Sequence, residues 1–308
     1  MKIGFGLPVS GSWATPETIA HVAVRAEQLG YHSLWTFQRV LAPPDHSWGE
    51  TYRSVHDPLL PLAYAAALTG RIRLGVAVVN LPFLSPVLLA KQFATLDVLS
   101  GGRLDAGLGN GWADPEFTAT GATKRAQGRR ADEFITLLRR LWTEEVVTHA
   151  GEFYRVPGMR LDPKPVQRPH PPILLGAFAP SALRRAGRLC DGWVSSSRAD
   201  PTRLGEAVAQ VRAAAEQAGR DPDQLRMVCR GSAKVRPAGG PDQAPLVGTL
   251  DQIRSDVDAI AAQGITELFI DLNFDPEVGS PDADPASSRR RADEALEAFA
   301  PGRQEGDR

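Results

Sequence analysis

Residues 71–112 of the chain read RIRLGVAVVNLPFLSPVLLAKQFATLDVLSGGRLDAGLGNGW. The pattern predicts a buried strand over residues 74–79, a helix from about residue 87 to residue 99, and a second strand over residues 104–108. Strands that are buried on both faces and joined by a helix indicate a parallel β-α-β unit. The second strand is followed by a glycine-rich turn, and glycines at the carboxyl end of a strand allow a flat or phosphorylated ligand to approach the backbone.

The same alternation of strand and helix patterns continues along most of the 308 residues. Strands are expected at residues 2–7, 32–37, 74–79, 104–108, 172–178, 192–196, 225–235 and 265–273. Helices are expected at residues 16–29, 58–68, 87–99, 128–142, 181–189, 201–218, 251–263 and 286–300. Eight strands and eight helices in one alternation favour an α/β protein with a closed (β/α)8 or TIM barrel over an open doubly wound sheet. We therefore predict one barrel domain over residues 1–300, followed by a disordered tail at residues 301–308.

Three segments interrupt this rhythm. Residues 146–170 are too long for an ordinary connection, and the pattern VVTHAGEFYRV at their start predicts an insertion that carries a β-hairpin. Residues 236–245, RPAGGPDQAP, are typical of a mobile surface loop. Residues 275–288 contain three prolines and are expected to be poorly ordered.

The composition is that of an ordinary soluble globular protein, with 43% hydrophobic and 23% charged residues. A net charge of -1 without a basic stripe argues against binding to nucleic acid. No apolar run approaches the length of a membrane span, and Met1-Lys2 leads into a strand rather than a signal peptide. We therefore expect a cytoplasmic protein with no membrane partner. The two cysteines, Cys190 and Cys229, are interpreted as buried free thiols.

Three classes of enzyme are disfavoured because their sequence signatures are missing. A metal-dependent barrel hydrolase needs clustered histidine and acidic ligands at strand ends, and the strand ends offer no converging set, so no metal site is expected. A nucleophilic hydrolase would carry Gly-x-Ser-x-Gly at a sharp strand-to-helix turn, which does not occur. The absence of G-x-G-x-x-G at the first helix argues against a nicotinamide cofactor bound in Rossmann fashion.

Two stretches carry a family resemblance. LAKQFATLDVLSGGRLDAGLGNGW at residues 89–112 and PKPVQRPHPPILLGAFAPSALRRAGRLCDGW at residues 163–193 strongly resemble the luciferase-like monooxygenase superfamily, particularly its branch that uses the deazaflavin coenzyme F420. The resemblance spans roughly residues 1–275. It implies an oxidoreductase that transfers a hydride between coenzyme F420 and a small organic substrate with an activated C=C or C=O bond.

The resemblance leaves two alternatives open. One is an FMN-dependent monooxygenase on the same scaffold, and the other is a non-catalytic member that binds flavin or another ligand. A flavin or deazaflavin reductase system would supply the reduced cofactor as a partner. Relatives are often homodimers that pack the helices after strands two and three, and the apolar stretches at residues 59–63 and 87–89 permit such a dimer.

The resemblance places the cofactor ring against a bulge in the third strand, which in this superfamily often contains a non-prolyl cis peptide. Aligned on the preceding glycine, Ala77-Val78 occupies this place, with Asn80 next to the pyrimidine edge of the ring. From the residues alone, this run is a buried strand that ends in a polar residue.

Two further strand ends complete the expected cofactor site. The resemblance places the backbone of Asn110-Gly111 against the cofactor and Trp112 beside it, where some sugar-phosphate-oxidising relatives carry an acid. It places the cofactor phosphate on the backbone of Gly176-Ala177-Phe178, with help from Ser181. Amides at a helix N-terminus together with a hydroxyl favour a phosphate. The alternative reading is that Ser181 only caps its helix.

The candidate catalytic residues follow strand two. Deazaflavin relatives commonly place Asp-His there, whereas this chain has Gln38-Arg39. Gln38 is able to hydrogen-bond a ring or substrate, and Arg39 either stabilises a developing oxyanion or forms an ion pair with a loop acid. A proton donor is then missing, and His46 and His56 in the long loop that follows are the candidates. This departure favours reduction of an activated double bond, or an oxygen-using reaction, over sugar-phosphate or secondary-alcohol oxidation.

Three tryptophans fall in loops at the carboxyl ends of the expected strands. They are Trp13, Trp48 and Trp112. Tryptophan in such a loop either fills a gap in the packing or forms the wall of a site for a flat ligand. Because all three lie at the same end of the predicted barrel, we interpret Trp13 and Trp48 as walls of a substrate pocket.

Overall fold

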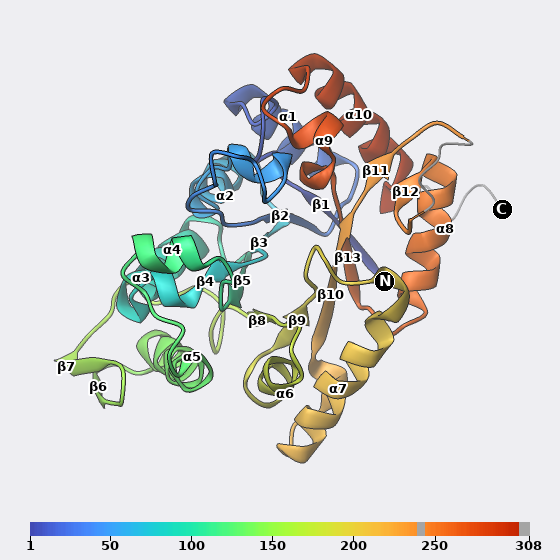
Figure 1. Ribbon diagram of the computed structural model, residues 1–308. Coiled ribbons are helices and arrows are strands. Elements are labelled where there is room, and N and C mark those ends of the chain that lie inside the picture. The colour runs from blue at the N-terminus through green and yellow to red at the C-terminus, as the bar shows by residue number, and fades with distance from the viewer. Residues whose placement is uncertain (239–243, 302–308) are drawn as a thin grey trace.

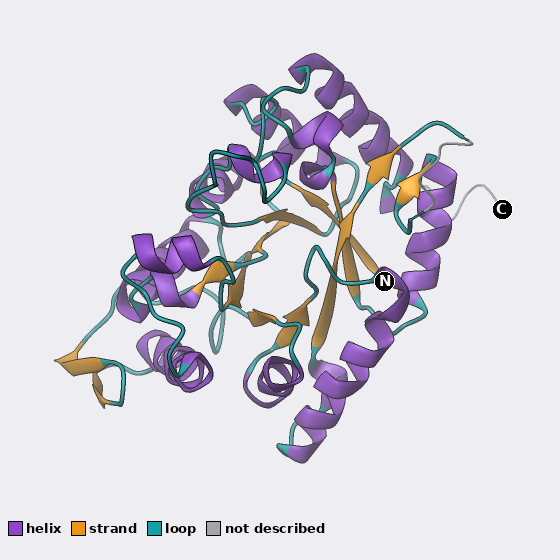
Figure 2. Cartoon of the chain, in the orientation of Figure 1, coloured by secondary structure: helices purple, strands orange, loops and turns teal. Residues whose placement is uncertain are grey.

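Eight parallel strand positions close into a barrel that is surrounded by helices in the computed structural model, which describes residues 1–238 and 244–301 (Figures 1 and 2). Pairing of β13 with β1 and of β3 with β5 completes the circle. The strands in order around the barrel are β1 Lys2–Gly6, β2 Ser33–Thr36, β3 Arg73–Val76, β5 Leu104–Gly109, β8 Ile173–Gly176, β9 Gly192–Val194, β10 Arg226–Ser232 and β13 Glu267–Asp271. The predicted barrel class is confirmed, and each expected strand range overlaps one of these strands.

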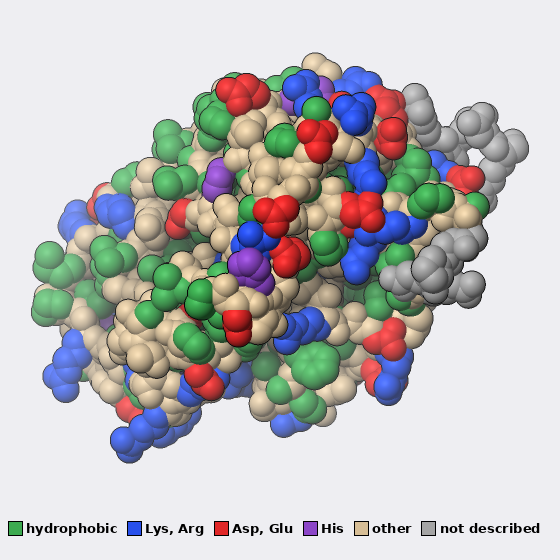
Figure 3. Space-filling view, turned by 45° about the horizontal axis from the view of Figure 1, so that its top comes forward, with side chains coloured by type: hydrophobic (Ala, Val, Ile, Leu, Met, Phe, Trp, Pro, Cys, Tyr) green, Lys and Arg blue, Asp and Glu red, His purple; other side chains and the backbone are tan. Residues whose placement is uncertain are grey.

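The outer layer consists of helices that follow the strands in sequence, as predicted (Figure 2). The longer helices are α1 Pro16–Gln28, α2 Leu59–Leu68, α3 Pro86–Leu99, α5 Gln127–Thr143, α6 Pro180–Leu189, α7 Leu204–Gln217, α8 Leu250–Ala261 and α10 Pro285–Ala298. None of the helices in the described residues is both long and apolar enough to cross a bilayer. On the face in Figure 3, acidic and basic side chains are interspersed, in keeping with the low net charge.

Local sequence signals set several helix starts. The Thr15 side chain accepts a hydrogen bond from the backbone N–H of Thr18, and Pro16 occupies the first turn of α1, where no N–H is needed. At the start of α8, Thr249 and Gln252 form a capping box, each side chain accepting from the other's backbone N–H. The caps satisfy orphan backbone donors, so the helix boundaries agree with the sequence expectation to within a few residues.

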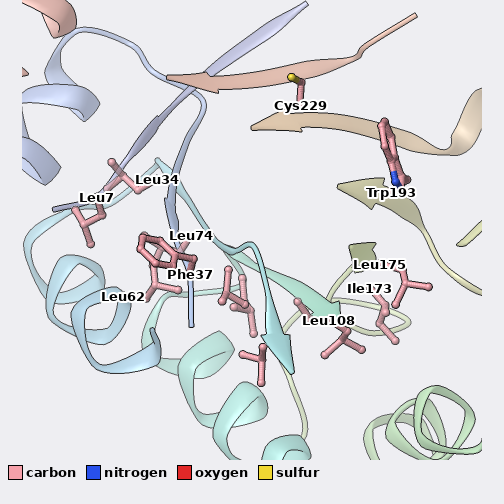
Figure 4. Close-up of a cluster of buried hydrophobic side chains, with 14 of the residues drawn as sticks. Leu7, Leu34, Phe37, Leu62, Leu74, Leu108, Ile173, Leu175, Trp193 and Cys229 are labelled. Carbon is pink, nitrogen blue, oxygen red and sulfur yellow. The ribbon is translucent and has the colours of Figure 1, made fainter. Parts of the chain in front are cut away.

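Two apolar layers hold the barrel together. Inward-facing side chains, including the stacked pair Trp35 and Phe269 with ring centroids 5.1 Å apart, fill the interior. A larger cluster lies between the strands and the helices, and Figure 4 shows part of it, with Leu34 and Leu74 on strands facing Leu62 of α2. The middle of the barrel is thus filled by side chains.

A buried ionic network closes the amino-terminal end of the barrel. Asp105 accepts hydrogen bonds from Arg73 and Arg226, and Arg226 also donates to Glu267 at 2.7 Å. Glu267 in turn accepts from the indole N–H of Trp35 at 3.0 Å. Burial by itself would raise the pKa of Asp105, but the two guanidinium groups outweigh burial and lower the pKa to about 2. The network satisfies the buried charges at the end opposite the strands' carboxyl termini.

The third strand position is broken after Val76. A cis peptide joins Ala77 to Val78, and the chain resumes as β4 Val79–Asn80, which pairs with β5. The bulge at Ala77-Val78 that the family resemblance implies is therefore present, and it contains the non-prolyl cis peptide that is often found there in the family. The predicted hairpin is also present, formed by β6 Val147–Ala150 and β7 Arg155–Met159, and it projects from the barrel (Figure 1).

The expectation of poor order over residues 275–288 was wrong. This segment forms the short helix α9 Pro276–Gly279 and the start of α10, and it is anchored by buried Asn273. The Asn273 side chain accepts from the backbone N–H groups of Val9 and Ser10 and donates to the carbonyl of Leu7. Prolines that suggested disorder instead begin helices. In the expected mobile loop, residues 239–243 lie outside the described residues, as do residues 302–308 of the expected tail.

Candidate active site

A cavity of about 590 Å³ opens at the carboxyl ends of the barrel strands. The predicted site residues that line it are Gln38, Arg39, Ala77, Val78, Asn80, Asn110, Gly111, Trp112, Gly176, Ala177 and Phe178. The carboxyl ends of parallel strands meet at one edge, so segments far apart in sequence converge there. The structure therefore brings together all three strand ends of the predicted cofactor site.

The side chain of Val78 packs against the backbone of two glycines, Gly109 and Gly176. A Cβ atom on Gly109 would collide with one methyl group of Val78, and a Cβ on Gly176 would lie 2.8 Å from the other. Close approach of this kind requires glycine at both positions. The result is a wall in which the Val78 side chain is flanked by bare backbone from β5 and β8, a surface suited to a flat ring.

Two amide side chains frame this wall. The carboxamide oxygen of Gln38 accepts from the backbone N–H of Asn80 at 2.8 Å and so fixes the end of β4 to the end of β2. The carboxamide oxygen of Asn110 is buried without a hydrogen-bond partner among the described residues, although its residue lines the cavity. A buried acceptor left unpaired is costly, so Asn110 offers a hydrogen-bonding position to a ligand.

Arg39 is held in a cage. Its guanidinium donates to the buried Glu116 carboxylate at 2.6 Å, and it lies 5.2, 4.5 and 4.9 Å from the ring centroids of Trp48, Tyr52 and Trp112. The ion pair with a loop acid, one of the two roles considered for Arg39, is thus present. Glu116 lies on a helix rather than in a loop: α4 Asp114–Ala119 forms between the helices expected at residues 87–99 and 128–142 and carries Glu116 to Arg39.

Arg230 of β10 lies on the cavity floor, only 8% exposed. It donates to the carbonyl of Ala77, and its Nε is 3.6 Å from the Asp271 carboxylate. Burial lowers the pKa of Arg230, and the charge of Asp271 opposes that effect. Along β10, Arg226, Val228 and Arg230 alternate inward, so Arg230 forms the layer above the apolar interior.

Five predicted site residues lie outside the cavity lining. His46 and His56 are exposed in the loop after β2, and Ser181 is exposed on α6 and makes no helix-capping hydrogen bond. Trp48 reaches the site only through the Arg39 cage, with its ring centroid 5.1 Å from that of Trp112. The interpretation of Trp13 as a pocket wall was wrong. Its side chain is fully buried in the core, because the loop after β1 folds beneath residues 275–288.

Comparison with known proteins agrees with this geometry. The sequence profile of the luciferase-like monooxygenase family matches residues 4–238. The chain belongs to this family. A similar sequence, an uncharacterised protein of Mycobacterium tuberculosis, is 31% identical to this chain over 240 residues. The match covers 77% of this chain and 74% of that protein.

Two further matches bear on the luciferase-like family's chemistry. An F420-dependent glucose-6-phosphate dehydrogenase of Kineococcus radiotolerans is 34% identical over 204 residues, or 64% of this chain and 57% of that enzyme. The crystal structure of monooxygenase RslO1 from Streptomyces bottropensis superposes with a TM-score of 0.79 at 26% identity, covering 98% of this chain and 99% of that one.

Sequence reasoning about this luciferase-like protein missed half of the lining. The unpredicted lining residues are Phe37, Tyr52, Gly109, Gln127, Ala179, Ala182, Ser195, Ser196, Ser197, Arg198 and Arg230. Arg230 had a usable signal, since a charged residue in the middle of a buried strand is expected to be either paired or functional. Glu116 had none, because its importance depends on a contact 77 positions away.

Proposed function

We propose that this protein is an oxidoreductase that binds coenzyme F420 in the cavity and transfers a hydride between it and a small organic substrate with an activated C=C or C=O bond. The observation that carries the proposal is the wall of Val78 between Gly109 and Gly176, which a flat ring is able to cover. Support also comes from the family membership and from the F420-dependent relative.

The residues present fit a deazaflavin. The unpaired carboxamide oxygen of Asn110 suits an N–H at the edge of a heteroaromatic ring. Backbone at Gly176–Phe178 leads from the wall to the mouth, where the 76% exposed ring of Phe178 lies beside the start of α6. Backbone amides there suit a phosphate, while the exposed Ser181 contributes at most from the rim.

When bound, the deazaflavin supplies the hydride. The chain's own part is to hold the ring flat on Val78, to cover it with the Arg39 and Trp112 cage, and to exclude bulk water. Hydroxyl groups of Tyr52 and Ser195 also line the cavity and are the candidates for delivering a proton, in place of the exposed His46 and His56.

The decisive experiment is a pair of titrations of the apo-protein, one with F420 and one with FMN, followed by quenching of tryptophan fluorescence. Micromolar or tighter binding of F420 with much weaker binding of FMN is expected. Binding of neither cofactor would refute the site assignment and favour a non-catalytic protein.

A glycine variant links that binding to the proposed wall. Gly109→Ala drives its new methyl group into Val78, and overpacking of this kind costs about 1–3 kcal/mol. We expect F420 affinity to fall by about tenfold or more. The matched control is Gly205→Ala on α7, whose added Cβ has its nearest neighbour 3.7 Å away and should leave the affinity unchanged. Equal affinity of both variants would contradict the wall assignment.

An FMN-dependent monooxygenase is the second candidate. Similarity over the full chain to a Streptomyces monooxygenase favours it. Such an enzyme would depend on a partner flavin reductase for reduced FMN. Preferential FMN binding, together with substrate-dependent oxygen uptake when a flavin reductase and NADH are added, would establish this function instead.

A further inference from the structure

The charged side chains that line the cavity are of one sign. Among the described residues, Arg39, Arg198 and Arg230 line it, and no aspartate or glutamate does. The carboxylates that accompany two of them, Glu116 and Asp271, are buried outside the lining. A ligand in the cavity therefore meets guanidinium groups directly and carboxylates only behind them.

Arg230 is the deepest of the three. Its guanidinium lies 5.3 and 5.0 Å from the ring centroids of Phe37 and Phe274, and its Nε contacts Asp271 without hydrogen-bond geometry. Its one side-chain hydrogen bond within residues 1–238 and 244–301 goes to the carbonyl of Ala77. A guanidinium has five N–H donors. Arg230 is thus a buried cation that lines the cavity and has N–H groups available to a ligand.

Unmet donors of a buried cation are costly, and an oxygen anion is the ligand that satisfies them best. Arg230 remains protonated even though burial lowers its pKa, because guanidinium is a very weak acid and Asp271 opposes the shift. Asp271 forms an ion pair with Arg230, but its oxygen at 3.6 Å leaves Nε without a hydrogen bond.

The cavity has two unlike halves. Bare backbone of Gly109–Gly111 and Gly176–Phe178 forms the half assigned to the cofactor ring. Phe37, Tyr52 and Arg230 belong to the other half, where aromatic rings surround a guanidinium. Aromatic walls accept a planar group, and a cation at its end selects an oxygen that carries negative charge.

We propose that Arg230 anchors the anionic oxygen of a planar, conjugated substrate, a carboxylate or an enolate, in the half of the cavity formed by Phe37 and Tyr52. This inference rests on the proposed function, because it leaves the glycine-lined half to the cofactor. Arg230 is then a substrate-binding residue that determines specificity for anions.

The test uses benzoate as probe and benzamide as its neutral counterpart of similar shape. Each is titrated by fluorescence into the full chain, with and without F420. The variants are Arg230→Gln, Arg230→Lys and, as a matched control, Arg198→Gln, which removes the exposed arginine that lies 4.7 Å over Trp112. F420 affinity is measured for every variant.

Wild-type protein should bind benzoate about tenfold or more tightly than benzamide, the range expected for a hydrogen bond to a charged group. Arg230→Gln should abolish this preference, Arg230→Lys should keep part of it, and Arg198→Gln should keep it in full, with F420 affinity within about threefold throughout. The proposal is overturned if wild type shows no preference or if Arg230→Gln retains it. A tenfold loss of F420 affinity in Arg230→Gln would also overturn it, by assigning the residue to the cofactor.

The two proposals fail separately. Wild-type protein that binds no F420 would refute the cofactor assignment, and the benzoate titration of the apo-protein would still decide the role of Arg230. If Arg230→Gln does not fold, the preference for benzoate in wild type and its response to Arg198→Gln remain as tests. Loss of the preference in Arg198→Gln would move the anion site to the rim and contradict the proposal.

Discussion

Replacing Glu116 by glutamine should show how much the cage around Arg39 depends on one buried charge. Glu116 is fully buried, accepts from Arg39 at 2.6 Å, and also accepts from the backbone N–H groups of Val40 and Leu41 at 2.7 and 3.2 Å. Glutamine keeps a carbonyl oxygen for the backbone donors but removes the negative charge. Breaking a buried ion pair by neutralising one partner costs about 3–5 kcal/mol. Because the two backbone bonds survive, we expect a loss of about 3 kcal/mol in the free energy of unfolding.

The measurement is urea unfolding at pH 7.5, followed by far-UV circular dichroism. The control is Glu206→Gln, which neutralises a carboxylate paired with Arg203 at 2.9 Å where both side chains are mostly exposed. Exposed pairs contribute roughly 0–1 kcal/mol, so this variant should unfold nearly as wild type does. In the double variant Arg39→Met with Glu116→Gln, the unpaired cation is gone and part of the stability should return. Equal stability of Glu116→Gln and Glu206→Gln would refute the reasoning.

Three other outcomes follow from the structure. Because the pKa of Asp105 is lowered from 3.8 to about 2, its ionisation contributes about 2 kcal/mol to the free energy of unfolding above pH 4, and this contribution is lost as the pH falls toward 2. In urea titrations, the difference in the free energy of unfolding between wild type and Asp105→Asn should therefore fall by roughly half between about pH 7 and about pH 3. Burial raises the pKa of both Cys190 and Cys229 to about 12, so neither thiol should react with a disulfide reagent at pH 8 until the protein is unfolded. We also propose that α2 and α3, where Leu60 and Leu88 are 71% and 62% exposed, form the interface of a homodimer; wild type should then sediment as a dimer and the variant Leu60→Glu with Leu88→Glu as a monomer.

The sequence was sufficient for the barrel and for most of one half of the site. Strands buried on both faces alternate with helices, and this local pattern predicts where the strands end to within about three residues. Since those ends must meet at one edge, Val78, Asn110 and Gly176 could be brought together before any contact was known. The packing of Val78 against Gly109 and Gly176 agrees with the same argument, because glycine at a strand end indicates that another group approaches the backbone closely.

What the sequence could not supply depends on contacts between distant segments. Trp13 was interpreted as a pocket wall because it lies in a loop. Its burial in the core depends on the packing of residues 275–288, which are anchored by Asn273. Glu116 looked like one of many surface acids. Arg230 stood out as a charged residue in a buried strand, but its place beside the Ala77 carbonyl depends on a contact between positions 153 residues apart.

The charges that line the cavity bear on the proposed direction of hydride transfer. Oxidation of an alcohol requires a base near the substrate, and none of the lining residues in the described part of the chain is a histidine, aspartate, glutamate or lysine. Gln38 and Arg39 stand where the family resemblance leads us to expect an acid and a histidine. Reduction of a conjugated carbonyl instead places negative charge on oxygen, which buried guanidinium groups stabilise without giving up a proton. Because Arg39 and Arg230 both line the cavity while their carboxylate partners lie outside the lining, we propose that the substrate gains the hydride and that a hydroxyl group such as that of Tyr52 supplies the proton.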